Sequence, residues 1–160
     1  MRDNFQAPQI LVGHSLGGTA AITAAEFIPE IKAVATIGSP CDTEHVRHNF
    51  ENQIDEINLK GEAEVILGGK KFNIKKQFLD DIQNQNMPEK IKNLKKALLV
   101  MHSPIDETVG IAHAQRIYES AKHPKSFISL DDADHLLMKS PADSKYVAEV
   151  LAAWVSRYLS

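Results

Sequence analysis

The sequence contains little that would tie it to an oxidising compartment, a membrane or a nucleic acid. Cys41 is its one cysteine, so no disulfide can form within the chain, as is usual in a reducing cytoplasm. No apolar run approaches the length of a membrane span, and residues 1–5 are too polar for a secretion signal. The formal net charge of −3 does not draw the surface as a whole toward nucleic acid or anionic lipid. We therefore expect a cytoplasmic protein that binds neither nucleic acid nor membrane.

Apolar residues are plentiful and regularly placed. They make up 43% of the 160 residues, which is enough for a single domain with a buried core. Strand-like stretches occur at residues 9–13, 32–37, 97–101 and 126–130, and helix-like stretches at 16–27, at 109–122 and from Ser140 onward. Strands that alternate with helices form parallel sheets with right-handed crossovers. The predicted fold class is α/β, with about four parallel strands flanked by helices.

The stretch from about residue 41 to residue 96 differs in composition and is predicted to be an insertion between two strands of the sheet. Gly68-Gly69 lies between residues 63–67 and 70–74, which is a strong hairpin signal. Residues 60–96 contain nine lysines and five acidic residues. A solvated face explains this excess more simply than a lid that attracts anions. Helices are expected at 44–59, 75–85 and 89–95, with Pro88 separating the last two.

The most informative stretch is residues 10–19, Ile-Leu-Val-Gly-His-Ser-Leu-Gly-Gly-Thr. An apolar run that ends in Gly-His-Ser-Leu-Gly predicts a strand, a very tight turn and the start of a helix. Ser15 would lie at the apex of this turn, with Gly13 and Gly17 removing Cβ atoms that would collide there. The helix beginning at Leu16 would direct its free N–H groups at an anion beside the serine. Alternatively, the stretch is an ordinary strand–turn–helix connection in which Ser15 caps the helix.

A serine hydroxyl that acts as a nucleophile needs a base, and the base needs an acid to orient it. His135 follows the fourth predicted strand and is the candidate base. Asp106, Glu107, Asp131 and Asp132 are candidates for the orienting acid, since they follow the third or the fourth strand. The carboxyl ends of parallel strands are where such sheets place their sites. Alternatively, Asp106 caps the helix that follows it, and His135 is a surface histidine.

The remaining histidines and the cysteine are weaker candidates. His102 and His14 are poorly placed to act as the base, and His14 lies between a glycine and the serine of the turn. The histidines lack a ligand spacing such as His-x₃-His with a nearby acid, so neither a metal nor another cofactor is expected. No base is assigned to Cys41, and we interpret it as a small buried residue rather than a reactive thiol.

These motifs resemble the α/β-hydrolase superfamily. The resemblance depends on Gly-His-Ser-Leu-Gly-Gly at residues 13–18, on Pro-Ile-Asp-Glu-Thr-Val at 104–109, and on Asp134-His135. The residues from His102 to Val109 and from His123 to Asp131 are similar to the hydrolase half of bacterial proteins in which an α/β-hydrolase precedes an OsmC-like domain. In this family the serine turn is called the nucleophile elbow.

The resemblance implies a serine hydrolase that acts on an ester, thioester or amide bond of a small acyl substrate. Ser15 would be the nucleophile, His135 the base and Asp106 the orienting acid, in the chain order of the family. Asp106 is preferred over the other acids because its turn fits the family's pattern. The backbone N–H of Leu16 would stabilise the oxyanion. The insertion at 41–96 would be a cap domain.

The resemblance also implies a truncated domain over residues 1–160, because the family's elbow follows about four strands that have no counterpart before Ser15. The loop that donates a second oxyanion N–H would be missing, so we expect impaired activity. Two alternatives remain. One is a non-catalytic remnant that needs a missing N-terminal half or a partner chain, and the other is a binding module that uses the basic insertion.

The first predicted strand, residues 9–13, would then lie at the edge of the sheet. Ile10, Leu11 and Val12 carry neither charge nor proline to discourage pairing with another chain. We expect two copies to pair across this edge as a homodimer. The alternative is that residues 1–8 fold back over it.

Overall fold

The computed structural model describes residues 7–42, 51–67, 70–83 and 85–159. The chain divides into two compact units, one made of Met1–Cys41 and Met87–Ser160 and the other of Asp42–Asn86. We call them the sheet unit and the insertion unit. In the described ranges, no helix has both the length and the apolar character that crossing a membrane requires.

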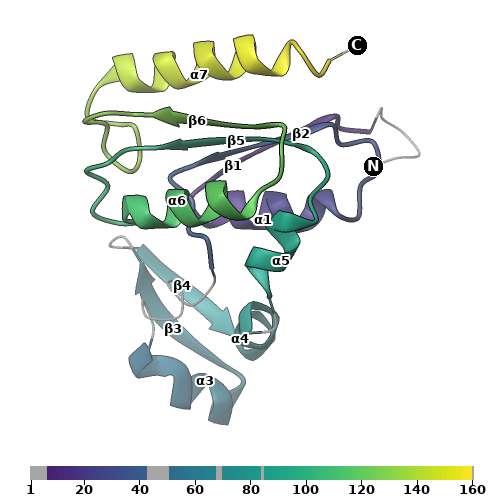
Figure 1. Ribbon diagram of the computed structural model, residues 1–160. Helices are drawn as coiled ribbons and strands as arrows, with labels where there is room; N and C mark the ends of the chain where they lie inside the picture. Colours follow the sequence, from purple (N-terminus) through teal and green to yellow (C-terminus); the bar gives the residue numbers. More distant parts are fainter. Residues whose placement is uncertain (1–6, 43–50, 68–69, 84, 160) are drawn as a thin grey trace. The chain divides into compact units, whose positions relative to one another are not determined.

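The sheet unit is built on a four-stranded parallel sheet with the order β1-β2-β5-β6 (Figure 1). A helix follows β1, β5 and β6, as expected for crossovers between parallel strands. The predicted α/β class and the four parallel strands are therefore confirmed. The elements are β1 (Ile10–His14), α1 (Leu16–Ala25), β2 (Ala33–Ile37), α5 (Met87–Lys92), β5 (Ala97–His102), α6 (Ile111–Ser120), β6 (Lys125–Ser129) and α7 (Pro141–Val155).

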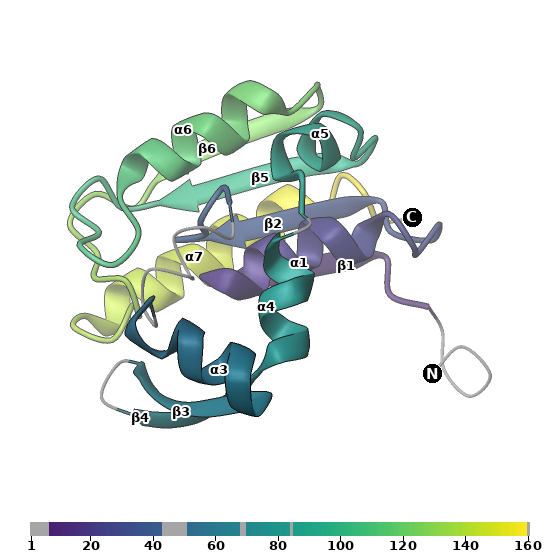
Figure 2. The ribbon, with the colours of Figure 1, turned by 90° about the horizontal axis from the view of Figure 1, so that it is seen from below.

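The sheet is covered on both faces, and its strands are apolar on both sides for that reason. All five residues of β2 and all six of β5 are buried. Helix α7 lies over one face, whereas α1 and α6 lie over the other (Figures 1 and 2). On the α1 side the core includes Val34, Leu98 and Val100, and on the α7 side it includes Ala35, Ile37, Leu99 and Met101.

Two helix starts show how proline is used. Ser140 caps α7 by accepting the N–H of Ala142 at 3.2 Å, and Pro141 occupies the first turn. The prediction that Pro88 separates two helices is wrong, because Pro88 lies in the first turn of α5. A proline is tolerated there, since the N–H that it lacks would have no partner in the helix.

The boundary of the insertion also differs from the prediction of 41–96. The insertion unit ends at Asn86, and α5 belongs to the sheet unit. The reason is packing: Met87 and Ile91 are 1% and 2% exposed and lie in the same core as β2 and β5.

The insertion unit contains the predicted hairpin, which is confirmed by antiparallel pairing of β3 with β4. Gly61 ends α3 in a left-handed conformation with a φ of 86°, which suits glycine. The expected helix at 44–59 lies partly outside the described residues. Within them the unit comprises η1 (Glu51–Gln53), α3 (Ile54–Lys60), β3 (Glu62–Leu67), β4 (Lys70–Lys75) and α4 (Lys76–Gln83), with Ile57, Ala63, Val65, Leu79 and Ile82 buried.

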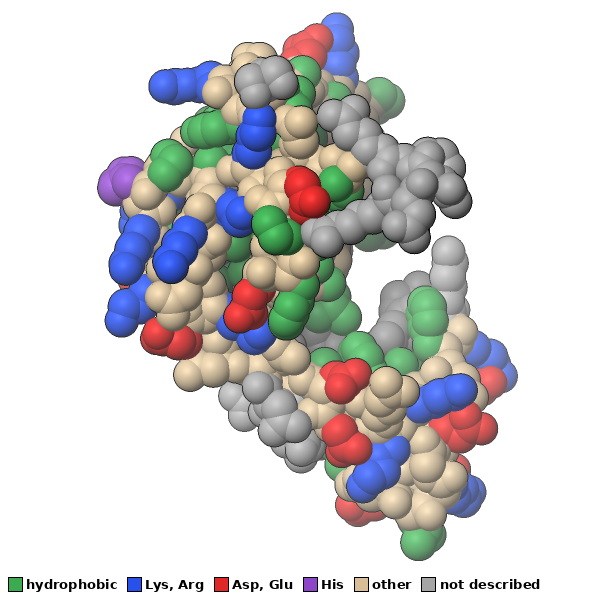
Figure 3. Space-filling view, turned by 90° about the vertical axis from the view of Figure 1, so that its right-hand side faces the viewer, with side chains coloured by type: hydrophobic (Ala, Val, Ile, Leu, Met, Phe, Trp, Pro, Cys, Tyr) green, Lys and Arg blue, Asp and Glu red, His purple; other side chains and the backbone are tan. Residues whose placement is uncertain are grey.

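The lysine excess of residues 60–96 is not a property of the insertion unit. The sequence of Asp42–Asn86 has six basic and nine acidic residues, because four of the nine lysines lie beyond Asn86. Lysines within the unit pair with acids, as Lys60 does with Glu56 and Lys71 with Glu64, each at 2.8 Å. Basic and acidic side chains are interspersed over the lower part of Figure 3. The charge pattern therefore favours a solvated face over a lid that attracts anions.

The glycines of the turn after β1 are not equivalent. A Cβ at Gly13 would lie 2.2 Å from the backbone oxygen of Gly17, and a Cβ at Gly18 would lie 1.9 Å from Oγ of Ser39. A Cβ at Gly17 would meet no atom within 4 Å. The expectation that Gly13 and Gly17 both avoid a collision is thus correct for Gly13 and wrong for Gly17. Gly18 is the second crowded position.

We predict opposite effects for two alanine substitutions. Gly13→Ala should lower the free energy of unfolding by about 3 kcal/mol or more, because the clash is with backbone that cannot rotate away. Gly17→Ala should be neutral or stabilising by up to ~1 kcal/mol, because alanine is the better helix residue. Urea unfolding followed by circular dichroism measures both. Equal losses in the two variants would contradict this account of the turn.

A second prediction concerns β1, which is an edge strand: β2 pairs with it on one side, and no described residue pairs with its other side. We propose that two copies of the chain pair along this edge. Light scattering after size-exclusion chromatography should then give twice the mass of the chain. Val12 is 48% exposed, so Val12→Lys should give a monomer without disturbing the core.

The matched control is Tyr146→Lys, which adds the same charge at a side chain that is also 48% exposed but lies on α7. It should leave the dimer intact. Leu11 is a poorer choice for substitution, since it packs against the core. A wild-type monomer at micromolar concentration would rule out edge pairing.

Candidate active site

Ser15 lies in a strained turn between β1 and α1. Its φ of 51° and ψ of −131° are rarely adopted by a residue with a side chain. Its backbone N–H donates to the carbonyl of Ile37 at 2.8 Å, which holds the turn against the end of β2. The side chain makes no capping hydrogen bond to α1. The alternative interpretation of Ser15 as a capping serine is therefore wrong, and its hydroxyl is directed elsewhere.

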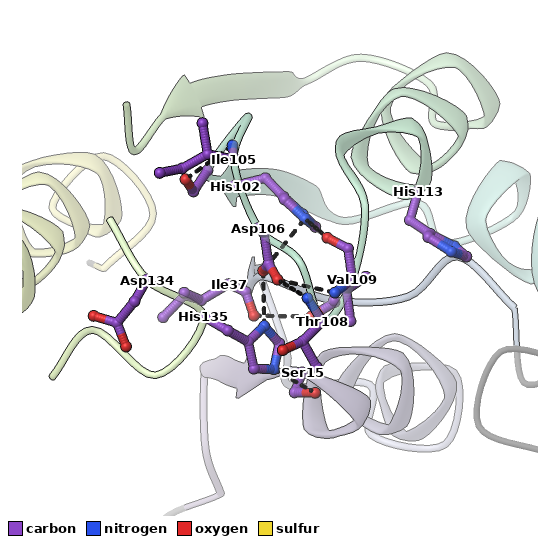
Figure 4. A network of polar contacts seen from close by, with 12 residues as sticks. Ser15, Ile37, His102, Ile105, Asp106, Thr108, Val109, His113, Asp134 and His135 are labelled. Atoms are coloured by element: carbon purple, nitrogen blue, oxygen red, sulfur yellow. Dashed lines mark hydrogen bonds and ion pairs between the residues drawn. The ribbon is translucent and has the colours of Figure 1, made fainter. Parts of the chain in front are cut away.

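The hydroxyl of Ser15 is directed at His135. Oγ of Ser15 and Nε2 of His135 are 3.1 Å apart, and Nδ1 of His135 lies 2.7 Å from Oδ2 of Asp106. Figure 4 shows the imidazole of His135 between the other two side chains. The structure thus brings together all three residues that the sequence analysis singled out.

Asp106 has two roles at once. Its Oδ1 accepts the backbone N–H groups of Thr108 and Val109 at 2.8 and 2.9 Å, while Oδ2 faces His135. It therefore closes the turn that precedes α6, and it also bonds the histidine. The alternative that Asp106 caps the helix is wrong, because the N-cap of α6 is Gly110. Asp106 is 7% exposed, and the competing acids Glu107, Asp131 and Asp132 are exposed.

Burial by itself would raise the pKa of Asp106. Hydrogen bonds from His135, Val109 and Thr108 and the charge that His135 can carry outweigh burial, so the pKa lies below its usual value. An ionised carboxylate accepts hydrogen bonds and cannot donate them, so the proton in the bond to His135 belongs to Nδ1. Nε2 of a neutral imidazole is then bare and faces the hydroxyl of Ser15 as an acceptor.

Buried polar groups fix the turn that carries Asp106. Nε2 of His102, which is fully buried, donates to the carbonyl of Val109 at 2.7 Å and closes the turn (Figure 4). The hydroxyl of Ser103 donates to the carbonyl of Asp131 at 2.9 Å, which links this turn to the loop after β6. His102 thus stabilises this turn.

The loop that carries His135 is shaped by Asp134. The carboxylate of Asp134 accepts the backbone N–H groups of Leu136, Met138 and Lys139 at 2.8–3.2 Å. These bonds, the one from Lys139 foremost, lower the pKa of Asp134. In Figure 4 its side chain points away from the imidazole of His135. Asp134 therefore organises the loop without touching Ser15.

Leu16 directly follows Ser15 and begins α1. The first N–H groups of a helix have no acceptor within it, and the positive end of the helix dipole lies there. The backbone N–H of Leu16 is thus a hydrogen-bond donor next to the hydroxyl of Ser15.

Two contacts of histidines were not foreseen from the sequence. Nε2 of His14 lies 2.7 Å from the carbonyl oxygen of His135. Nδ1 of His113 lies 3.2 Å from both the sulfur and the backbone nitrogen of Cys41, which is buried as expected. Thiolate and imidazole are zinc ligands, but here the backbone N–H of Cys41 already donates to that nitrogen. No spacing in the sequence links these partners.

The chain matches no family model, and no curated protein matches it. Solved structures do match. The esterase domain of a Rhodothermus marinus protein is 45% identical, with a TM-score of 0.85, over 99% of this chain and 65% of that one. The α/β hydrolase GrgF of Penicillium sp. sh18 is 14% identical with a TM-score of 0.73, over 98% of this chain and 67% of that one. The monoacylglycerol lipase of Paleococcus ferrophilus is 16% identical with a TM-score of 0.67, over 96% of this chain and 70% of that one.

The second and third matches are likenesses of fold alone. The first is also a likeness of sequence, and this chain spans less than two thirds of its length. The parallel sheet and the strained serine turn agree with these likenesses. The chain has the α/β-hydrolase fold, and the comparisons support a relationship to the α/β-hydrolase superfamily.

Proposed function

We propose that the protein is a serine hydrolase that cleaves an ester, thioester or amide bond, with Ser15, His135 and Asp106 as its catalytic residues. The proposal depends mainly on one observation. The two ring nitrogens of His135 contact residues that lie 29 and 120 positions away in the sequence. A structural role for one histidine does not require a carboxylate on one side and a strained serine on the other. General-base activation of a hydroxyl requires both.

The proposed reaction follows from the tautomer of His135, in which Nδ1 carries the proton and Nε2 can accept one. Nε2 of His135 accepts the hydroxyl proton as Oγ of Ser15 attacks the substrate carbonyl, and Asp106 stabilises the imidazolium that forms. The backbone N–H of Leu16 stabilises the negative charge on the carbonyl oxygen. His135 then gives its proton to the departing alcohol, thiol or amine, which leaves an acyl group on Ser15. A water molecule, deprotonated by His135, releases the acid and restores the serine.

The substrate class is proposed from the neighbours and from the chemistry of the site. One neighbour, which is 45% identical, is named an esterase domain, and this favours an ester over an amide. The chain spans 65% of the length of that esterase domain. The competing proposal is a non-catalytic chain that needs further segments to form its site. The two differ in whether Ser15 is reactive.

We predict that a fluorophosphonate probe labels the protein at Ser15. Ser15→Ala should abolish labelling, and His135→Ala should slow it by at least about 100-fold, because the general base is lost. Ser144→Ala is the matched control, since Ser144 is an exposed serine on α7 that bonds only its own helix. Labelling that persists in Ser15→Ala would remove the nucleophile assignment. An unlabelled but folded wild type would favour the non-catalytic alternative.

A further prediction tests Asp106. Asparagine can still accept the N–H groups of Thr108 and Val109, but it carries no charge to stabilise the imidazolium of His135. Asp106→Asn should therefore lower the rate of labelling by up to about 10⁴-fold, as for comparable triads, while the fold is kept. A loss below about 3-fold would contradict the role of the carboxylate.

Because the pKa of Asp106 is lowered, Asp106→Asn should also change how the free energy of unfolding depends on pH. The unfolded chain binds this proton first, near its ordinary pKa of about 3.9, so the ionised carboxylate stabilises the fold above that pH. The contribution is lost as pH falls through the lower pKa of the folded state. The difference in unfolding free energy between wild type and Asp106→Asn should therefore narrow below about pH 4. Denaturant unfolding across this range measures it, and a difference that is constant with pH would contradict the assignment.

A further inference from the structure

His14 is the last residue of β1 and immediately precedes Ser15. Its Nε2 lies 2.7 Å from the backbone carbonyl oxygen of His135, across 121 positions of sequence. A carbonyl oxygen only accepts hydrogen bonds, so Nε2 of His14 must carry the proton and donate it. The neutral Nε2–H tautomer and the charged imidazolium both have this proton. The bond therefore persists whichever of the two forms His14 takes.

We propose that His14 is a positioning residue that holds the backbone of His135 at a fixed distance from the nucleophile. This inference rests on the proposed function, since it assigns His14 to the same reaction. The ring of His135 is already bonded at Nδ1 to Asp106. A ring fixed at one nitrogen can still shift if its backbone moves, and His14 provides the second point of attachment.

The other bonds of the His135 loop do not provide this attachment. Those of Asp134 lie within the loop itself, and the bond between Ser103 and Asp131 links the loop to the turn after β5. Among the described residues, the bond from His14 is the one that ties the backbone of this loop to the strand carrying Ser15. Because His14 and Ser15 are adjacent, the donor and the nucleophile move together.

The two imidazoles also contact each other. The ring centroids of His14 and His135 are 4.9 Å apart, with the ring planes inclined at 47°. The ring of His14 thus limits the sideways movement of the ring of His135. Proton transfer from Ser15 depends on the 3.1 Å distance between Oγ and Nε2, which is near the upper limit of productive geometry. A small displacement of the loop would exceed that limit.

The test compares two variants of His14. Glutamine can place an amide N–H close to the position of Nε2, whereas phenylalanine keeps the ring but has no donor. His14→Phe should lower kcat for an activated acetate ester, and the rate of fluorophosphonate labelling, by roughly 10- to 100-fold. KM should change less than twofold, because His14 acts on His135 and not on the substrate. His14→Gln should recover most of the rate.

Two measurements without catalysis separate this inference from the proposed function. In ¹⁵N spectra of histidine-labelled wild type, neutral His14 should be the Nε2–H tautomer. Amide exchange of residues 131–140, followed by mass spectrometry, should be faster in His14→Phe than in wild type or His14→Gln. The tautomer is read on wild type, so the inference stays testable if His14→Phe does not fold.

The outcomes are distinct. His14 does not position His135 if His14→Phe changes neither the amide exchange of residues 131–140 nor the reaction rate. The same conclusion follows if neutral His14 is the Nδ1–H tautomer. In both cases the proposed function is unaffected. If wild type is folded but unreactive while exchange and tautomer are as expected, His14 anchors the loop and the proposed function is wrong. A loss of rate that glutamine restores, together with faster exchange in His14→Phe alone, supports both.

Discussion

The close approach between the end of β1 and the start of α1 is the constraint on which the site depends. The backbone of Gly13 passes so near that of Gly17 that no side-chain atom fits between them. The chain can therefore reverse from strand to helix within one residue, and that residue is Ser15. Its left-handed backbone is unfavourable on its own. The bond from its N–H to Ile37 and the packing of α1 against the sheet hold it in place.

Parallel pairing extends this constraint to the rest of the site. The register aligns His14 with Ile37, Ile37 with Met101, and His102 with Ser129, so the four strands end together. The turns that follow β1, β5 and β6 all begin where their strands end, at the carboxyl ends of the sheet's strands. Strand registry then brings residues that are separated by more than a hundred positions close together. Only the loops have to supply the final placement of the side chains.

Much of this arrangement follows from local sequence patterns. The strand–turn–helix at Ser15, the hairpin of the insertion unit and the cap of α7 each have a short signal with a physical reason. Ser15, Asp106 and His135 each follow a predicted strand, which is why the sequence could suggest that they lie close together. The choice of Asp106 over its neighbour Glu107, however, came from a family pattern, and the structure explains it by burial and by the bonds to Thr108 and Val109.

What the sequence did not predict depends on distances between segments. Gly18 is crowded by Ser39, which follows β2. No spacing within residues 13–18 indicates this contact. Pro88 was read as a helix breaker because pattern alone does not say on which side of a proline a helix begins. The contact of His14 with the carbonyl of His135 joins the end of β1 to the loop after β6. Such contacts are determined by tertiary packing, which local propensity does not encode.

The double use of Asp106 shows how structure and proposed chemistry are coupled. One carboxylate oxygen closes the turn before α6 and the other bonds His135, so the group that shapes the turn also fixes the tautomer of His135. Each bond keeps the carboxylate ionised and thereby strengthens the other. A competing acid such as Asp131 is exposed, whereas Asp106 is buried in the turn that it closes. The role of an acid in such a site is therefore decided by the turn that it caps as much as by its distance from the histidine.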